Sequence, residues 1–362
     1  MATDRRLERQ GALRAALAAE GLDALLVTHL PNIRYLTGFT GSAALLVVGA
    51  DRTVLVTDFR YAMQGPAEAD GAADVEVDQK NVWDRLGKVL SGGPPGALGF
   101  ESQALTVRDA ERLSALTRHR LVPTVELVER LRVAKSPEEV EAIRAAASLA
   151  QDALAELLPT VRVGQTELEI GAGLEGALRR RGSEWHPFPT IVASGPRSAL
   201  PHARTSARPV GRGEWLLLDF GAQVDGYCAD LTRTLVVGGR ADDRQRAVHE
   251  LVRTAQTRAL EHLRAGMTGR EADALAREVI AARGFGEAFG HSLGHGLGLE
   301  VHEAPRLAPT AEAALPPHAV VTVEPGVYLP GWGGVRLEDD VYLGPGGPER
   351  LSDGRTELVE LV

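Results

Sequence analysis

Histidines and glycines are concentrated in the segment 291–303, whose sequence is HSLGHGLGLEVHE. His291, His295 and His302 lie within twelve positions, and the glycines between them let backbone approach a ligand closely and give room for it. The segment holds too few apolar residues for an ordinary core element. It is therefore the first candidate for a functional site.

Acidic residues follow apolar runs that read as strands. Asp219 ends the run WLLLD and Asp230 comes shortly after it, while Glu324 ends the run VVTVE and Glu338 comes shortly after that. Any one of these carboxylates could cap a turn or pair with a surface base. Four carboxylates in one site would repel each other and shift strongly in pKa, so they would require cations. The set predicts a metal site.

The charge and chemistry of these side chains indicate which metals would fit. Four carboxylates carry a charge of about −4, which two divalent ions would offset. An oxygen-rich shell with one imidazole suits manganese, cobalt or zinc, and we expect Cys228 to be a packing residue. Two ions about 3.5–4 Å apart can hold a shared water, lower its pKa and polarise a carbonyl oxygen. This chemistry is suited to the hydrolysis of an amide.

The elements that must position these residues show an internal repeat. The stretches 161–182 and 263–284 match, each with a glycine two positions before a threonine at a helix start and a glycine at the helix end. Thr166 and Thr268 are 102 positions apart (268 − 166 = 102). Long helices are expected before the two stretches, over 136–158 and 241–263.

The acidic residues fit the same repeat. Asp219 and Glu324 are 105 positions apart (324 − 219 = 105), and Asp230 and Glu338 are 108 apart (338 − 230 = 108). Two related halves would bring the four carboxylates together at the axis between them. Chance similarity between amphipathic helices is the alternative, but glycine, threonine and glycine matching at one offset favours duplication.

The residues before this repeat predict a separate α/β domain. Helices and short apolar strands alternate there, while 32–38 and 58–61 carry polar groups that we interpret as turns and strand ends. At Ser136 a capping box with Pro137 and Glu139 marks the start of a new helix. We therefore expect two domains, 1–132 and 133–362.

Composition excludes several classes of function. The net charge of −9 argues against nucleic-acid or anionic-membrane partners, which require basic surfaces. One cysteine excludes an internal disulfide, and no apolar run approaches the roughly 20 residues of a membrane span. The N-terminus lacks the apolar region of a secretory signal, so we expect a cytoplasmic protein.

Two other catalytic motifs can be set aside. The glycines of 294–298 lack the strand-turn-helix context of a phosphate-binding loop. Ser194 and Ser292 have no nucleophile context, which argues against a serine hydrolase.

The acids and the histidine segment resemble those of the pita-bread-fold metallopeptidases, specifically aminopeptidase P and prolidase, which release residues preceding proline. The resemblance covers nearly the whole chain. It implies a creatinase-like α/β amino-terminal domain and an α+β pita-bread catalytic domain with internal pseudo-two-fold duplication. It also implies that five residues bind two divalent ions, manganese being favoured: Asp219, Asp230, His295, Glu324 and Glu338.

The same resemblance implies further roles. Glu324 would also hold the bridging water and pass a proton to the leaving nitrogen, and His302 would stabilise the oxyanion. His291 would act in catalysis and substrate binding, and Arg336 would support the site near Glu338. With Arg306, whose charge could recognise a substrate carboxylate, the expected substrate-binding set is His202, His291, His302, Arg306 and Arg336.

The expected activity is that of an Xaa-Pro aminopeptidase, with an Xaa-Pro dipeptidase as the alternative. A dipeptidase must recognise the free carboxylate of its substrate, which Arg306 could do. A methionine aminopeptidase would leave the amino-terminal domain unexplained, and creatinase works without this ligand set. A pita-bread protein that has lost catalysis and acts as a binding module is a further alternative. We also expect a homodimer, in which 32–38 approach the partner's site.

Overall fold

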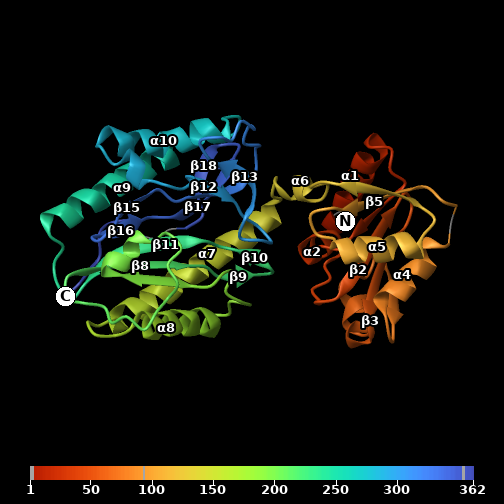
Figure 1. The fold of residues 1–362 in the computed structure, drawn as a ribbon, viewed down its shortest axis with the longest axis horizontal. Coiled ribbons are helices and arrows are strands. Elements are labelled where there is room, and N and C mark those ends of the chain that lie inside the picture. Colours follow the sequence, from red (N-terminus) through yellow and green to blue (C-terminus); the bar gives the residue numbers. More distant parts are fainter. Residues whose placement is uncertain (1–3, 93, 353–354) are drawn as a thin grey trace. The chain divides into compact units, whose positions relative to one another are not determined.

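The computed structural model describes residues 4–92, 94–352 and 355–362. The chain forms two compact units, Met1–Arg132 and Val133–Val362 (Figure 1). Among the described residues, no helix combines the length and apolar character needed to cross a membrane.

The first unit is built on a six-stranded sheet in the order β4-β3-β2-β1-β5-β6. Strands β1, β2 and β3 pair antiparallel, and the outer pairs are parallel. Helices α4 and α5 pack on the sheet through Leu86, Leu90 and Leu113 (Figure 1). This mixed arrangement confirms the predicted α/β domain. Its elements are α1 (Arg5–Ala19), β1 (Ala24–Val27), α2 (Leu30–Thr37), β2 (Ala44–Gly49), β3 (Thr53–Asp58), η1 (Phe59–Tyr61), α3 (Gln64–Glu68), β4 (Asp74–Asp78), α4 (Val82–Leu90), β5 (Ala97–Glu101), α5 (Val107–Leu116), β6 (Arg120–Thr124) and α6 (Glu129–Arg132).

The segment 32–38 is a helix, so its interpretation as a turn was wrong. Pro31 stands in the first turn of α2, where its missing N–H costs nothing, and Gly38 ends the helix with φ of 83°. Asn32 is fully buried and donates to Glu101 and Glu129. Most side chains of α2 therefore face the interior of their own unit.

The second unit contains the predicted repeat as two helix pairs, α7–α8 and α9–α10. Each of the four helices begins with a capping box, at Ser136, Thr166, Asp242 and Thr268. The elements of the first half are α7 (Pro137–Leu157), η2 (Leu158–Thr160), α8 (Glu167–Arg180), β7 (Ile191–Ser194), η3 (Gly195–Ala199), β8 (Glu214–Phe220), β9 (Gln223–Val224), β10 (Tyr227–Cys228) and β11 (Leu231–Val237). Those of the second half are α9 (Asp243–His262), α10 (Gly269–Ala282), η4 (Gly286–Ala288), β12 (Gly294–Gly296), β13 (Glu303–Leu307), β14 (Val320–Val323), β15 (Gly326–Leu329), β16 (Gly333–Arg336), β17 (Asp339–Gly344), β18 (Gly347–Arg350) and β19 (Glu360–Leu361).

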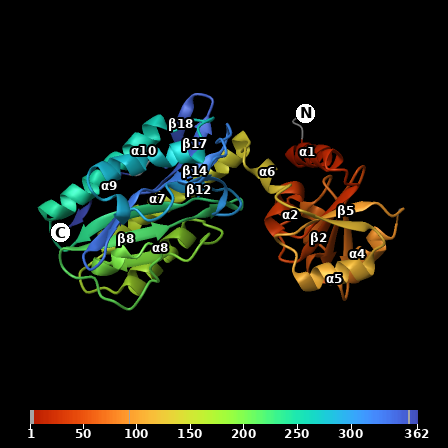
Figure 2. The same cartoon turned by 45° about the horizontal axis from the view of Figure 1, so that its top comes forward.

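Each helix pair covers its own sheet. The first half has the sheet β11-β8-β7, to which β19 from the C-terminal end adds beside β11. Leu174 and Leu178 of α8 share an apolar core with Leu216 and Leu218 of β8. The second half has the sheet β13-β12-β14-β17-β18, packed against α9 and α10. The strands lie between α8 on one side and α9–α10 on the other (Figures 1 and 2). The predicted α+β fold with internal duplication is confirmed.

Candidate metal centre

Strand β11 connects the acids of the two halves. Thr232 stands opposite Asp219 in the antiparallel pairing with β8, and it forms an isolated bridge with Glu338 on its other side. Asp230 directly precedes β11. One strand therefore brings carboxylates from both halves of the repeat together.

Strand β12 presents His295 between two glycines that lie against neighbouring strands. A Cβ atom on Gly294 would lie 2.0 Å from the Thr322 oxygen, and one on Gly296 would lie 2.1 Å from the Ala304 oxygen. These glycines are needed for strand packing, so the expectation that they give room to the peptide was wrong at these two positions.

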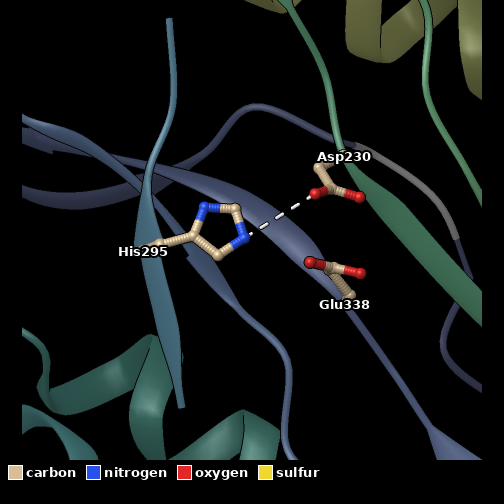
Figure 3. A group of neighbouring side chains, drawn as sticks. All are labelled: Asp230, His295 and Glu338. Atoms are coloured by element: carbon tan, nitrogen blue, oxygen red, sulfur yellow. Dashed lines mark ion pairs between the residues drawn. The ribbon is translucent and has the colours of Figure 1, made fainter. Parts of the chain in front are cut away.

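Asp230, His295 and Glu338 point toward one another (Figure 3). Each offers one ligand atom, and these atoms all lie within 4.8 Å of one another. The Nε2 atom of His295 is 3.8 Å from Asp230 Oδ2 and 3.6 Å from Glu324 Oε1. The structure thus brings four of the five predicted ligands into one cluster.

Asp219, the fifth predicted ligand, is held by an arginine at the edge of this cluster. Its Oδ2 accepts a hydrogen bond from Arg336 Nη2 at 2.5 Å, while its buried Oδ1 has no hydrogen-bond partner within the described ranges of the chain. Burial raises the pKa of Asp219, although the charge of Arg336 opposes this. One carboxylate oxygen is therefore left without a partner among the residues that the structure describes.

Negative charge in the cluster is poorly compensated by the protein itself. The pKa values of Asp230 and Glu324 are raised well above their usual ranges, mainly by burial and to a smaller extent by repulsion from Glu338. The pKa of Glu338 is raised to about 8, mainly by burial and to a smaller extent by repulsion from Asp219. Burial lowers the pKa of His295 to about 4, so its imidazole is neutral and can donate a lone pair. These groups fit divalent cations.

The other two histidines of the segment 291–303 occupy different environments. His291 contacts the Tyr328 hydroxyl through Nε2 at 2.9 Å, and its Nδ1 is 3.9 Å from Glu324 Oε2. His302 is exposed, with its ring centre 4.4 Å from that of His295. His291 therefore lies beside the acids, and His302 lies at their solvent side.

Arg336 is engaged on all sides by protein groups. It is 3% exposed, and besides Asp219 it donates to Tyr328 Oη at 2.8 Å and to Thr232 Oγ1 at 3.0 Å. Thr232 in turn donates to Glu338 Oε2 at 2.6 Å. These contacts favour the supporting role expected from the resemblance over direct substrate binding.

Thr232 and Tyr328 were missed by the sequence analysis. Thr232 is two positions after Asp230 at the start of an apolar strand, and residues two apart face the same side. That alternation could have identified it. Tyr328 gave no such signal, because its place depends on the pairing of β15 with β16.

The comparisons with known proteins agree with this geometry. Residues 141–345 match metallopeptidase family M24, and residues 9–134 match the creatinase/prolidase N-terminal domain. Both matches and the duplicated fold define a two-domain pita-bread metallopeptidase. The chain belongs to metallopeptidase family M24, which confirms the resemblance seen in its residues.

Individual relatives match over nearly their whole length. The uncharacterized peptidase YqhT of Bacillus subtilis is 42% identical over 350 residues, covering 96% of this chain and 99% of that protein. A structure named Xaa-Pro dipeptidase from Bacillus anthracis has a TM-score of 0.94 at 39% identity, over 98% of this chain and 100% of that one. A structure named X-Pro aminopeptidase from Thermotoga maritima has a TM-score of 0.90 at 37% identity, over 97% and 99%.

Proposed function

We propose that this metallopeptidase binds two divalent ions and hydrolyses the bond between an N-terminal residue and a following proline. The observation that carries the proposal is the cluster of Asp230, His295, Glu324 and Glu338, whose negative charge Arg336 offsets only in part. These residues and Asp219 are the proposed ligands, and manganese is the proposed metal, with cobalt and zinc as alternatives.

We assign different roles in amide hydrolysis to different side chains of the protein. When bound, the two ions supply a water of lowered pKa and polarise the substrate carbonyl. Glu324 lies 3.6 Å from His295 and 3.9 Å from His291, and its proposed role is to take a proton and return it to the leaving nitrogen. His302 faces solvent beside His295, where it can donate a hydrogen bond to the oxyanion. Tyr328 fixes the ring of His291 next to Glu324.

The length of the substrate depends on what recognises its carboxyl end. Arg306 is exposed on β13 opposite His295, and its charge acts on the pKa values of His302 and His295. Among the described residues, the structure gives no ion pair to the guanidinium of Arg306. A cation without a protein partner at the edge of the site favours a dipeptide with a free carboxylate. We therefore propose Xaa-Pro dipeptides as preferred substrates, with longer Xaa-Pro peptides as the alternative.

Metal removal and restoration test this function. The protein is stripped with a chelator, reloaded separately with manganese, cobalt or zinc, and assayed on Xaa-Pro dipeptides and matched tripeptides. We expect activity to return with metal and to be greater on dipeptides. A preference for tripeptides would support the aminopeptidase, and no hydrolysis of either peptide would support a binding protein.

Substitution of the ligands tests the site itself. Asp230→Ala and His295→Ala should each lose metal, measured by elemental analysis after dialysis, together with activity. Retention of both metal and activity would refute the assignment. Arg52→Ala is a control, because Arg52 lies in an exposed ion pair with Asp74 in the first unit.

A homodimer in the cytoplasm stays a prediction from the sequence and the family. If the second copy completes the site, a monomer should be inactive. Light scattering and activity measured on the same sample would decide this, and a fully active monomer would contradict it.

A further inference from the structure

Glu167 is a fully buried carboxylate outside the metal cluster, at the first position of α8. Its Oε1 accepts hydrogen bonds from the Ser194 amide at 2.8 Å and the Ser194 hydroxyl at 2.9 Å. Its Oε2 accepts from the Ser206 amide at 3.0 Å and the Ser206 hydroxyl at 2.6 Å. The two serines delimit the segment 195–205, so one carboxylate holds both ends of this segment.

The middle of the segment is tied to the same carboxylate. Arg197 Nε lies 3.1 Å and 3.2 Å from the two oxygens of Glu167. Arg197 also donates through Nη2 to the Arg204 carbonyl oxygen at 2.5 Å. The positive charge of Arg197 and the N-terminus of α8 both stabilise the buried negative charge.

His202 belongs to this segment, which is also bonded to Gly334 and Arg336. Ser198 Oγ accepts a hydrogen bond from the Gly334 amide at 2.8 Å, and the Pro201 carbonyl accepts one from Arg336 Nη1 at 3.3 Å. His202 is exposed and directly follows Pro201, whose carbonyl is bonded by the same Arg336 that holds Asp219. The place of His202 therefore depends on how the segment 195–205 is held.

In the second half of the repeat, the position that corresponds to Glu167 has no side chain. Gly269 corresponds to Glu167, since both directly follow the capping threonine of their helices. A Cβ atom on Gly269 would lie 2.0 Å from the Arg306 carbonyl oxygen, so α10 packs directly on β13. The duplicated fold thus forms without a carboxylate at this position, and Glu167 serves the segment of the first half.

We propose that Glu167 is a positioning residue that fixes His202 for contact with the substrate. This rests on the proposed function, because His202 is a substrate contact only if the site binds Xaa-Pro peptides. A glutamine at position 167 keeps the size of the side chain but turns an NH₂ group toward donors. The segment 195–205 then loses part of its anchorage, because hydrogen bonds to a charged acceptor are stronger than those to a neutral one.

Kinetics of Glu167→Gln, His202→Ala and the double variant test the coupling. We expect Glu167→Gln to raise KM for an Xaa-Pro dipeptide about tenfold, with a smaller change in kcat. Manganese affinity, measured by titration calorimetry, should change by less than about twofold, since the ligands are untouched. In a protein that already carries His202→Ala, Glu167→Gln should raise KM little further. Independent, multiplicative effects of the two substitutions would overturn the proposal.

Hydrogen exchange of the backbone amides in 195–206 tests the anchorage without substrate. Glu167→Gln should speed exchange there about tenfold or more. The matched control is Glu169→Gln, the same change two positions along α8 at an exposed capping residue. It should leave exchange in 195–206 unchanged. Equal exchange in Glu167→Gln and wild type overturns the proposal whether or not the protein cleaves Xaa-Pro peptides, so its failure is distinguishable from failure of the proposed function.

A milder variant covers the case in which Glu167→Gln does not fold. Ser206→Ala removes one hydroxyl donor at 2.6 Å and leaves the carboxylate intact. It should raise exchange in 195–206 and KM in the same direction by a smaller factor. If Ser206→Ala changes neither quantity, Glu167 does not position the segment through this contact and the proposal fails.

Discussion

One hydroxyl group joins the basic and acidic residues at the centre of the site. Thr232 Oγ1 accepts a hydrogen bond from Arg336 and donates one to Glu338. A carboxylate whose second oxygen is fixed in this way has one oxygen oriented for a cation. Such outer partners orient ligands and contribute strongly to metal affinity.

Thr232→Val should therefore weaken metal binding while leaving every proposed ligand in place. We expect a loss of about 10- to 100-fold in manganese affinity, measured by titration calorimetry on the metal-free protein. Thr234→Val is the matched control, because the Thr234 hydroxyl forms its hydrogen bonds among the described residues with the backbone of Arg336. Equal affinity in Thr232→Val and wild type would remove Thr232 from the support of Glu338.

Arg306→Ala tests how the carboxyl end of the substrate is recognised. Because Arg306 is exposed near His302 and His295, its loss should raise KM for an Xaa-Pro dipeptide by about tenfold or more. The dipeptide amide, which has no carboxylate, should be nearly unaffected. If both substrates lose the same factor, Arg306 does not select the carboxylate.

The site residues could be predicted from the sequence to different degrees. Asp219, Asp230, Glu324 and Glu338 follow strands in a repeated pattern, so their convergence could be predicted from the sequence alone. The hydrogen bonds of Thr232 could not, because they join it to Arg336 and Glu338, which lie 104 and 106 positions away. Those of Tyr328 to Arg336 and His291 depend on the strand pairing of β15 with β16 and on the fold around it. Glu167 carried no signal, since a glutamate in the first turn of a helix is common for its charge alone.

At the scale of elements, the segment from β12 to β13 is held by a buried ion pair. Lys135 Nζ lies 3.0 Å from Glu303 Oε2, and the two side chains are 1% and 7% exposed. Glu303 Oε1 also accepts the Glu300 amide at 3.1 Å. This pair fixes the turn that carries His302, just before Glu303.

Lys135→Met should destabilise the protein because it removes the buried counter-ion that lies against Glu303. We expect a loss of about 3 kcal/mol in the free energy of unfolding, measured by urea titration at pH 7. Adding Glu303→Gln should restore part of that loss, since the buried negative charge is then removed as well. A double variant less stable than Lys135→Met would contradict this account.

Helices whose starts are set by residues close together in the sequence were predicted correctly. The capping boxes at Ser136 and Thr268 place helix starts correctly, because the cap is made by residues within four positions. Helix α2 was missed because its polar residues suggested a turn. Its Asn32 is instead satisfied by Glu101 and Glu129, which lie 69 and 97 positions away.

At the scale of the molecule, the acidic cluster makes the stability of the metal-free protein depend on pH. The folded protein holds a proton on Glu338 with a pKa of about 8, above the ordinary value of 4.5. A raised carboxyl pKa means that the folded state binds more protons than the unfolded state, so stability falls as pH rises. The loss begins above about pH 4.5 and is complete above about pH 8.

Chelated protein should therefore unfold at lower urea concentration at pH 8 than at pH 6. Bound manganese offsets the same charges, so the metal-loaded protein should lose this dependence. Thermal or urea unfolding at both pH values, with chelator and with manganese, measures the difference. A metal-free protein equally stable at pH 6 and pH 8 would contradict the raised pKa values.

The closeness of Asp230 and Glu338 across the repeat also has a consequence for the linkage between metal and fold. These residues are 108 positions apart (338 − 230 = 108), so the unfolded chain does not hold them together and an ion bound by both would bind only the folded state. Such an ion stabilises the fold by mass action, by about 2.7 kcal/mol at a hundredfold excess over its Kd. With a single cysteine, this chain can form no internal disulfide. The metal centre would then be a removable link between the two halves, whose contribution rises with the concentration of free metal and is lost on chelation.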